Sequence, residues 1–450
     1  MTLESLNIRR HLGGFSLMLC LVVGMSTQAS AESSSGLRTE GPTVSLTLHE
    51  AMEMAAQQNP SVLLSKERIE AARGEVTTQL GAMLPNLSGN ARQSKQTQFL
   101  GTYGLSPVRT DPFDIFDARV SASQNLFSLS LIQRWRASRE TLHGAEFDAD
   151  AGRFDTMASA ALAYLEGLKA TSAVTMRQAT QQLIQDLLLT TKRRHKEGVV
   201  TALDVARLEG QLAHERQQVI SAQADVERAT NTLRNLLSLP SDVRIVLSDT
   251  LRRDHETAQS YGQVLDEAIA HRPEVQAQFK RIKAAALTYS SITGERLPSL
   301  VAQGDTGLVG NRWNSTTETY NMALVLQIPL FDGGQREGRV ATARSHVRQE
   351  ELRLRIVLNQ VEAEVTDAQI AFDAAQEKVA LAEAGLQAAT REATLARERY
   401  AVLTAANQFD VITAVASVAR ARENMVTALF ELNGARVNQA RATGTMAALY

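Results

Sequence analysis

The residues best suited to chemistry are carboxylates and histidines, but their spacing does not favour catalysis. Glu362, Glu364 and Asp367 lie together in a stretch rich in arginine and glutamine. On a helix such side chains are expected on solvated faces, where they pair with side chains one turn away. The eight histidines are scattered, and no two have the spacing of metal ligands. We therefore expect no metal site.

Motifs for nucleotide binding and hydrolysis are also missing. The chain has no glycine-rich phosphate loop, no H-E-x-x-H and no G-x-S-x-G. Its net charge of −2 gives no reason to expect a nucleic-acid partner. The sequence therefore predicts a protein that is not an enzyme and that binds no cofactor.

Residues 1–31 have the pattern of a secretory signal peptide. Arg9 and Arg10 precede a mostly apolar run over 12–25, and Ala29-Ser30-Ala31 matches a cleavage site. The run is short for a membrane span, although an N-terminal anchor helix is the alternative. The only cysteine, Cys20, lies in this run, so the mature protein is expected to have no disulfide and no thiol chemistry.

No later stretch has the 18 consecutive apolar residues of a transmembrane helix. An exported chain of this composition can enter a membrane only as a β-barrel, because every backbone polar group needs a partner in lipid.

The prolines mark an internal repeat. Asn59-Pro60-Ser61-Val62 matches Arg272-Pro273-Glu274-Val275, and Leu84-Pro85-Asn86-Leu87 matches Leu297-Pro298-Ser299-Leu300. The interval between the two prolines is the same in both halves. Because helix interiors exclude proline, the two long proline-free stretches that follow can hold long helices.

Each half also contains a pair of strand-like segments, in which apolar and polar residues alternate with period two. They cover 86–94 and 117–123, then 299–309, where alternation is poor, and 319–331. Strands of this length can cross a bilayer when tilted, with polar side chains toward a water-filled lumen and apolar ones toward lipid. The edge of a soluble β-sandwich is the alternative. The segments 101–112 and 310–318 are expected to be the loops that join the strands of each pair.

Each proline-free stretch is interrupted once, which predicts a helical hairpin in each half. The first pairs 128–195 with 202–238, and the second pairs 334–401 with 408–440. Gly198 and Thr201 suit the caps of the first break, and Thr404 and Asn407 those of the second. A helix of this length would extend for about 100 Å.

An ordered set of segments carries a family resemblance. It comprises "LTLHEAMEMAAQQNPSV", "LPNLS", "NLFSLS", "RRHKEGVVTALDV", "IPLFDGGQREG" and "RERYAVLTAANQFDV". No single segment is decisive, but their order in duplicate is specific. Over residues 46–443 the chain resembles the outer-membrane factor family, the TolC-like channels.

The resemblance implies an α+β membrane protein, in which a unit of one strand pair and one long helical hairpin is duplicated. Three chains would close a 12-stranded β-barrel in the outer membrane, continued by an α-helical barrel in the periplasm. The border between strand and helix would lie at Phe127 in the first half and at Phe331, Gly333 and Gly334 in the second.

The implied segments follow the chain in order. They are a signal peptide (1–31), an N-terminal segment with the first-repeat helices (32–85), strand pair 1 (86–127), helical hairpin 1 (128–239), an equatorial linker with the second-repeat helix (240–298), strand pair 2 (299–331), helical hairpin 2 (332–440) and a C-terminal tail (441–450).

The resemblance further implies a passive exit duct of a tripartite efflux pump or of a type I secretion system. Its partners would be two more copies of the chain, a periplasmic adaptor protein, an inner-membrane transporter and outer-membrane lipid. Cargo, pump and adaptor cannot be deduced from the sequence. The alternative is a non-conducting coiled-coil scaffold or adhesin of the envelope, and a metalloenzyme is a distant third.

In the family, the hairpin tips close the periplasmic entrance. The matching residues here are Arg399, Tyr400 and Asp410, with Arg194, His195 and Asp204 as first-half counterparts. Threefold symmetry would gather three copies of Asp410 near one axis. The second tip departs from the family pattern, since it lacks the glycine and has Thr413 where some relatives have a second acidic residue. The alternative role for Asp410 is a carboxylate favoured by the dipole at a helix N-terminus.

Overall fold

A computed structural model describes residues 42–251, 253, 261–402 and 408–446. The predicted signal peptide with Cys20, the predicted caps Thr404 and Asn407, and residues 447–450 lie outside the described residues. The side chain of Tyr400 also lies outside them.

The helices repeat with nearly identical lengths in the two halves. The helices α1 (Leu48–Gln58) and α5 (Tyr261–His271) have 11 residues each, and α2 (Pro60–Gly81) and α6 (Pro273–Gly294) have 22 each. The long helices α3 (Leu129–Lys196) and α7 (Gln335–Val402) have 68 residues each, and α4 (Ala202–Leu236) and α8 (Gln408–Thr443) have 35 and 36. The internal repeat that the prolines indicate is therefore a repeat of the fold.

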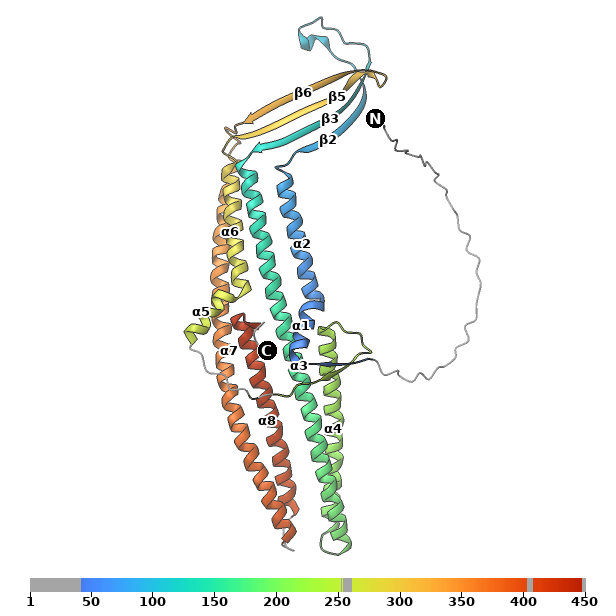
Figure 1. Ribbon diagram of the computed structural model, residues 1–450, viewed down its shortest axis with the longest axis vertical. Coiled ribbons are helices and arrows are strands. Elements are labelled where there is room, and N and C mark those ends of the chain that lie inside the picture. Colours follow the sequence, from blue (N-terminus) through green and yellow to red (C-terminus); the bar gives the residue numbers. More distant parts are fainter. Residues whose placement is uncertain (1–41, 252, 254–260, 403–407, 447–450) are drawn as a thin grey trace, which may run out of the picture. The chain divides into compact units, whose positions relative to one another are not determined.

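Four strands form one antiparallel sheet. They are β2 (Asn86–Gln96), β3 (Phe113–Phe127), β5 (Ser299–Arg312) and β6 (Ser315–Gln327), in the order β2-β3-β5-β6. Figure 1 shows this sheet at one end of the long helices. Each predicted strand overlaps one of these four, and β2 and β6 are the edge strands, each with a strand neighbour on one side only among the described residues.

The sheet has one polar and one apolar face. The register aligns Ser88, Ser121, Asp305 and Asn321 in one row across the four strands. The row that starts at Asn90, two residues further along β2, lies on the same face. The rows in between have their side chains on the other face. There Leu87, Ala122, Gly304 and Met322 share a row, and Leu87 and Met322 are 71% and 85% exposed. A single chain therefore leaves its apolar sheet face uncovered.

Two predictions about the strands are wrong in detail. The strand expected over 319–331 ends at Gln327, because Pro329 has no N–H to donate to a neighbouring strand. The segment 310–318, expected as a loop, is mostly strand, and only Trp313 and Asn314 turn between β5 and β6. The other expected loop, 101–112, lies in the long β2–β3 connection, which contains a 3-10 turn over Leu100–Tyr103.

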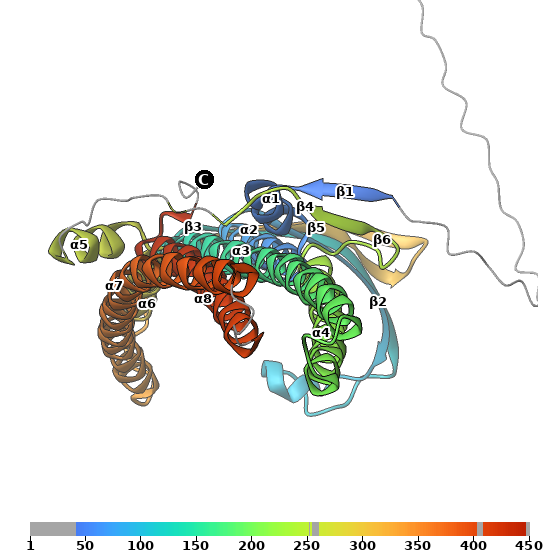
Figure 2. The ribbon, with the colours of Figure 1, turned by 90° about the horizontal axis from the view of Figure 1, so that it is seen from below.

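The helices pack side by side, and each long helix runs past two shorter ones. Helix α3 contacts α2 and α4 along one side and α6 and α8 along the other, while α7 contacts α6 and α8. Seen from below, α4, α3, α8 and α7 follow one another along an arc (Figure 2). None of the helices in the described residues combines the length and the apolar composition needed to cross a membrane.

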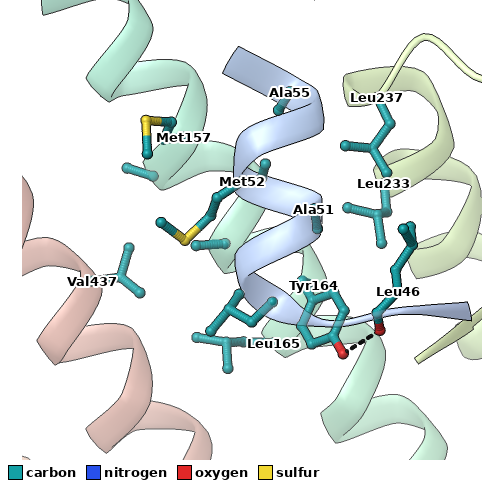
Figure 3. Close-up of a cluster of buried hydrophobic side chains, with 14 of the residues drawn as sticks. Leu46, Ala51, Met52, Ala55, Met157, Tyr164, Leu165, Leu233, Leu237 and Val437 are labelled. Atoms are coloured by element: carbon teal, nitrogen blue, oxygen red, sulfur yellow. Dashed lines mark hydrogen bonds between the residues drawn. The ribbon is translucent and has the colours of Figure 1, made fainter. Parts of the chain in front are cut away.

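The largest hydrophobic core lies midway along α3, around the fully buried Tyr164 (Figure 3). Here α1 packs against α3 and α4, and Val437 of α8 joins the core. Beside it, β1 (Thr43–Leu46) and β4 (Arg244–Leu247) form a two-stranded parallel sheet that the sequence does not predict. This core joins the N-terminal segment, the first hairpin and the segment that links the two halves.

Candidate functional site

The residues predicted to line the periplasmic entrance lie at the free ends of the two hairpins. In the first, Gly198 follows the end of α3 with a φ of +79°, a conformation that favours glycine. The His195 ring nitrogen Nδ1 lies 2.9 Å from the carbonyl oxygen of Val200, so His195 ties the turn to the helix end. Arg194 is one of four consecutive basic residues in the last turn of α3, where positive charge complements the helix dipole.

Asp204 closes a capping box at the start of α4. Its carboxylate accepts hydrogen bonds from the Thr201 backbone N–H at 3.1 Å and from the Thr201 hydroxyl at 2.7 Å. The Thr201 hydroxyl oxygen in turn accepts a hydrogen bond from the Asp204 N–H at 3.4 Å. The hydrogen bonds from Thr201 lower the pKa of Asp204. The contacts of Asp204 therefore hold the helix start.

At the second hairpin end the structure brings two predicted residues together. Asp410 lies in the first turn of α8 and Arg399 in the last turn of α7, with 4.0 Å between Oδ2 and Nη1. The side chains are 49% and 67% exposed, so this ion pair contributes little to stability. Such a pair can separate easily, and the position of Asp410 also suits a carboxylate at a helix N-terminus.

The start of α8 is anchored by buried valines behind Asp410. Val411 and Val415 pack against Leu183 and Leu187 of α3 and against Ala396 of α7. Higher up, Arg177 of α3 pairs with Glu423 of α8 at 3.0 Å and lies 3.9 Å from Glu215 of α4. The two hairpin ends therefore form one packed unit. The four-residue spacing of the valines is the only local signal for this packing in the sequence.

The predicted strand–helix border residues lie at the opposite ends of the long helices. Phe127 is the last residue of β3, and α3 begins two residues later. Phe331 is almost fully exposed, and Gly333 and Gly334 turn the chain with φ values of +71° and +85°. The Asp332 carboxylate then accepts a hydrogen bond from the Arg336 N–H at 2.9 Å, which caps α7.

A partly buried charge cluster that the sequence does not predict joins four helices. Arg272 at the start of α6 is buried and lies 2.6 Å from Glu364 of α7. Arg441 of α8 lies 3.6 Å from Glu364 and 2.6 Å from Asp155 of α3. Burial raises the pKa of Glu364, but the hydrogen bonds from Gln360 and Arg272 and the arginine charges lower it overall. The expectation of a solvated Glu364 is therefore wrong, because this half-buried carboxylate bridges two arginines.

Neither hairpin end has the geometry of a catalytic centre. In the part of the chain that the structure describes, no group of three or more His, Cys, Asp or Glu side chains could hold a metal ion. Both hairpin ends present exposed charged side chains, and the two ends pack against each other.

Comparison with known proteins agrees with this architecture. The family model "Outer membrane efflux protein" matches residues 51–238 and 264–445. The chain is 25% identical over 296 residues to the pyoverdine export outer membrane protein OpmQ of Pseudomonas aeruginosa, a match that covers 63% of this chain and 61% of the relative. The chain thus spans about three fifths of that relative's length.

Solved structures share the fold at low sequence identity. The outer membrane channel CmeC of Campylobacter jejuni superposes with a TM-score of 0.76 at 16% identity, over 88% of this chain and 85% of CmeC. The outer membrane protein VceC of Vibrio cholerae gives 0.74 at 19% identity, over 88% and 96%. Since the family model covers most of the sequence in both halves, the chain belongs to the outer membrane efflux protein family.

Proposed function

We propose that this chain is the outer-membrane exit duct of a tripartite efflux or secretion system. The observation that carries the proposal is the two-faced sheet with both edges open, joined to long helical hairpins. In lipid an open strand edge leaves N–H and C=O groups without partners, so β2 and β6 need strands from other chains.

Three chains satisfy this need. Four strands from each give twelve, enough for a closed barrel with the polar face toward its lumen and the apolar face toward lipid. The hairpins of the three chains then continue the duct through the periplasm. In this arrangement strand pairs 86–127 and 299–331 are the membrane part, hairpins 128–239 and 332–440 the periplasmic part, and the segments 32–85 and 240–298 lie around the equator.

The partners follow from the absence of an energy source in the sequence. An inner-membrane transporter drives export, and a periplasmic adaptor joins it to the hairpin ends. The pyoverdine export protein among the relatives supports a small molecule as one class of cargo. The duct itself is passive.

We further propose that the hairpin ends close the periplasmic entrance. Three copies of Asp410 gather near the axis, and each Arg399 balances the charge of its Asp410 in the closed state. The exposed 4.0 Å pair supports a closure that opens at low cost. The proposed entrance also includes Tyr400 on the second hairpin and Arg194, His195 and Asp204 on the first.

The test is conductance of the purified protein in a planar bilayer, together with its mass in detergent. We expect discrete channels and three times the mass of one chain. A stable monomer with intact strand content would exclude the trimeric duct, and a trimer without conductance would favour the non-conducting scaffold.

A further inference from the structure

The polar face of the sheet carries a fixed arrangement of charges away from the hairpin ends. Arg119 of β3 donates from Nε to Asp117 at 2.6 Å and from Nη1 to Asp305 of β5 at 2.9 Å. Each of the three side chains is about one-third exposed or less. No other element covers this face in the described residues, so the three groups bury one another.

The backbone makes room for this arrangement. Gly307 is the register partner of Arg119 on β5. A Cβ at Gly307 would lie 2.4 Å from the Cβ of Arg119 and 2.4 Å from the carbonyl oxygen of Ala118. Any other residue there would push the arginine away, whereas glycine lets the guanidinium reach diagonally to Asp305.

The charges on this face balance. Between the rows of Asn86 and Arg92, the register places four charged side chains on the polar face, namely Arg92, Arg119, Asp117 and Asp305. Arg92 shares its row with Asp117, so the four charged groups occupy three successive rows of the polar face. The apolar face carries Glu318 in the row between those of Asp117 and Arg119, which makes it a control at the same level.

We propose that Arg119, held by Asp117 and Asp305, forms together with Arg92 a charge-balanced belt that sets the ion selectivity of the membrane part of the duct. The inference rests on the proposed function, because three copies must face one lumen. Arg119 then keeps the belt from favouring small cations, and Asp305 keeps it from favouring small anions. The hairpin ends are unchanged in the variants below, so their contribution to selectivity cancels in the comparison.

The magnitude follows from Coulomb's law. Arg119→Gln leaves one uncompensated negative charge per chain and three in a trimer, and the estimate takes each charge to lie about 10 Å from the trimer axis. In water, with a Debye length of about 10 Å at 0.1 M salt, this favours a cation on the axis by about twofold and disfavours an anion by about twofold, so the cation-to-anion permeability ratio changes by about fivefold. Asp305→Asn should change the ratio by about the same factor in the opposite direction, and lower salt should enlarge both effects.

The experiment measures reversal potentials of single channels under a KCl gradient. Arg119→Gln should raise the cation-to-anion ratio, Asp305→Asn should lower it, and the double variant should return close to wild type. Glu318→Gln should have no effect. Trimer mass and strand content of each variant establish that it is folded, and the charge-balanced double variant covers the case in which Arg119→Gln alone misfolds.

The failures can be distinguished. If wild type conducts and neither Arg119→Gln nor Asp305→Asn shifts the reversal potential, the belt does not set the ion selectivity. The proposed function as an exit duct is unaffected by that result. If Glu318→Gln shifts it and the other variants do not, the faces are reversed and the inference is overturned. If wild type does not conduct, the proposed function fails and this inference fails with it.

Discussion

Replacing Tyr164 by phenylalanine tests whether the core on α3 depends on one hydroxyl group. The Tyr164 hydroxyl lies 2.8 Å from the carbonyl oxygen of Leu46 and 3.1 Å from the carboxylate of Asp249, and it accepts a hydrogen bond from the Asp249 N–H at 3.3 Å. It joins α3 to Leu46 at the end of β1 and to Asp249, two residues after the end of β4. The variant keeps the ring and removes only these contacts.

The structure limits the size of the effect. In the variant, the Leu46 carbonyl keeps the Ser248 N–H at 3.0 Å, and the Asp249 carboxylate keeps the Leu48 N–H at 2.7 Å. Only the Asp249 N–H loses its partner. One buried unsatisfied group costs about 1–2 kcal/mol, so the free energy of unfolding should fall by about that amount at pH 7.

The pH dependence gives the same prediction a second readout. Burial raises the pKa of Tyr164 from 10.0 to about 12. Because the folded-state pKa is raised, this stabilisation is fully present below pH 10 and is lost as the pH rises through 12. The loss is about 1.4 kcal/mol for each pH unit in this window. Phenylalanine cannot ionise, so only the wild type loses stability in this window. At pH 11 this loss is about 1.4 kcal/mol, which equals the advantage of the wild type at pH 7, so the free energies of unfolding of the two proteins should become equal near pH 11.

The assay is guanidinium unfolding followed by circular dichroism at a series of pH values, with Tyr103→Phe as the matched control because Tyr103 is exposed. The lysines and the other tyrosines are the same in both proteins, so their contributions cancel in the difference between the two free energies of unfolding. Equal stability at pH 7, together with parallel loss of stability above pH 10, would refute the role assigned to the hydroxyl.

Three further predictions concern the duct and its packing. Asp410→Ala should leave trimer yield unchanged but weaken cation selectivity and block by trivalent cations from the periplasmic side; wild-type values for both would remove Asp410 from the entrance. Phe372→Ala should destabilise the α7–α8 core by about 3–5 kcal/mol, because its side chain is buried against α8, whereas Ile370→Ala on the exposed face should cost less than about 0.5 kcal/mol; equal unfolding midpoints would contradict this packing. An epitope inserted at Ser106 or at the β5–β6 turn near Ser315 should be reached by antibody on intact cells, and one at Gly198 should not; the reverse result would invert the proposed orientation.

The long elements could be predicted from the sequence because their signals are local. Alternation of apolar and polar residues reports which face a side chain takes, and proline-free stretches report where long helices can lie. The end of β6 was missed because alternation continues past Gln327, while hydrogen bonding stops near Pro329. Pattern alone does not record the loss of an N–H donor.

Contacts between distant segments could not be predicted in the same way. β1 and β4 have four residues each, and their register joins Thr43 to Arg244, so no local period marks the pair. Glu364, which pairs with Arg272, comes from another helix, and a single arginine before a proline carries no sign of it. The hairpin ends could be located by resemblance, but the capping role of Asp204 needed coordinates.

The uninterrupted length of α3 has a mechanical consequence. From Tyr164 to the end of the helix at Lys196 there are about 32 residues, which at about 1.5 Å each make a lever of about 48 Å. A tilt of about 5° at the Tyr164 core moves the tip by about 4 Å over that length. A small tilt of α3 at the Tyr164 core is thus enlarged into a displacement of several ångströms at the end of the hairpin. A substitution that tilts α3 at this core would therefore displace the end of the hairpin, although no residue of that end has changed.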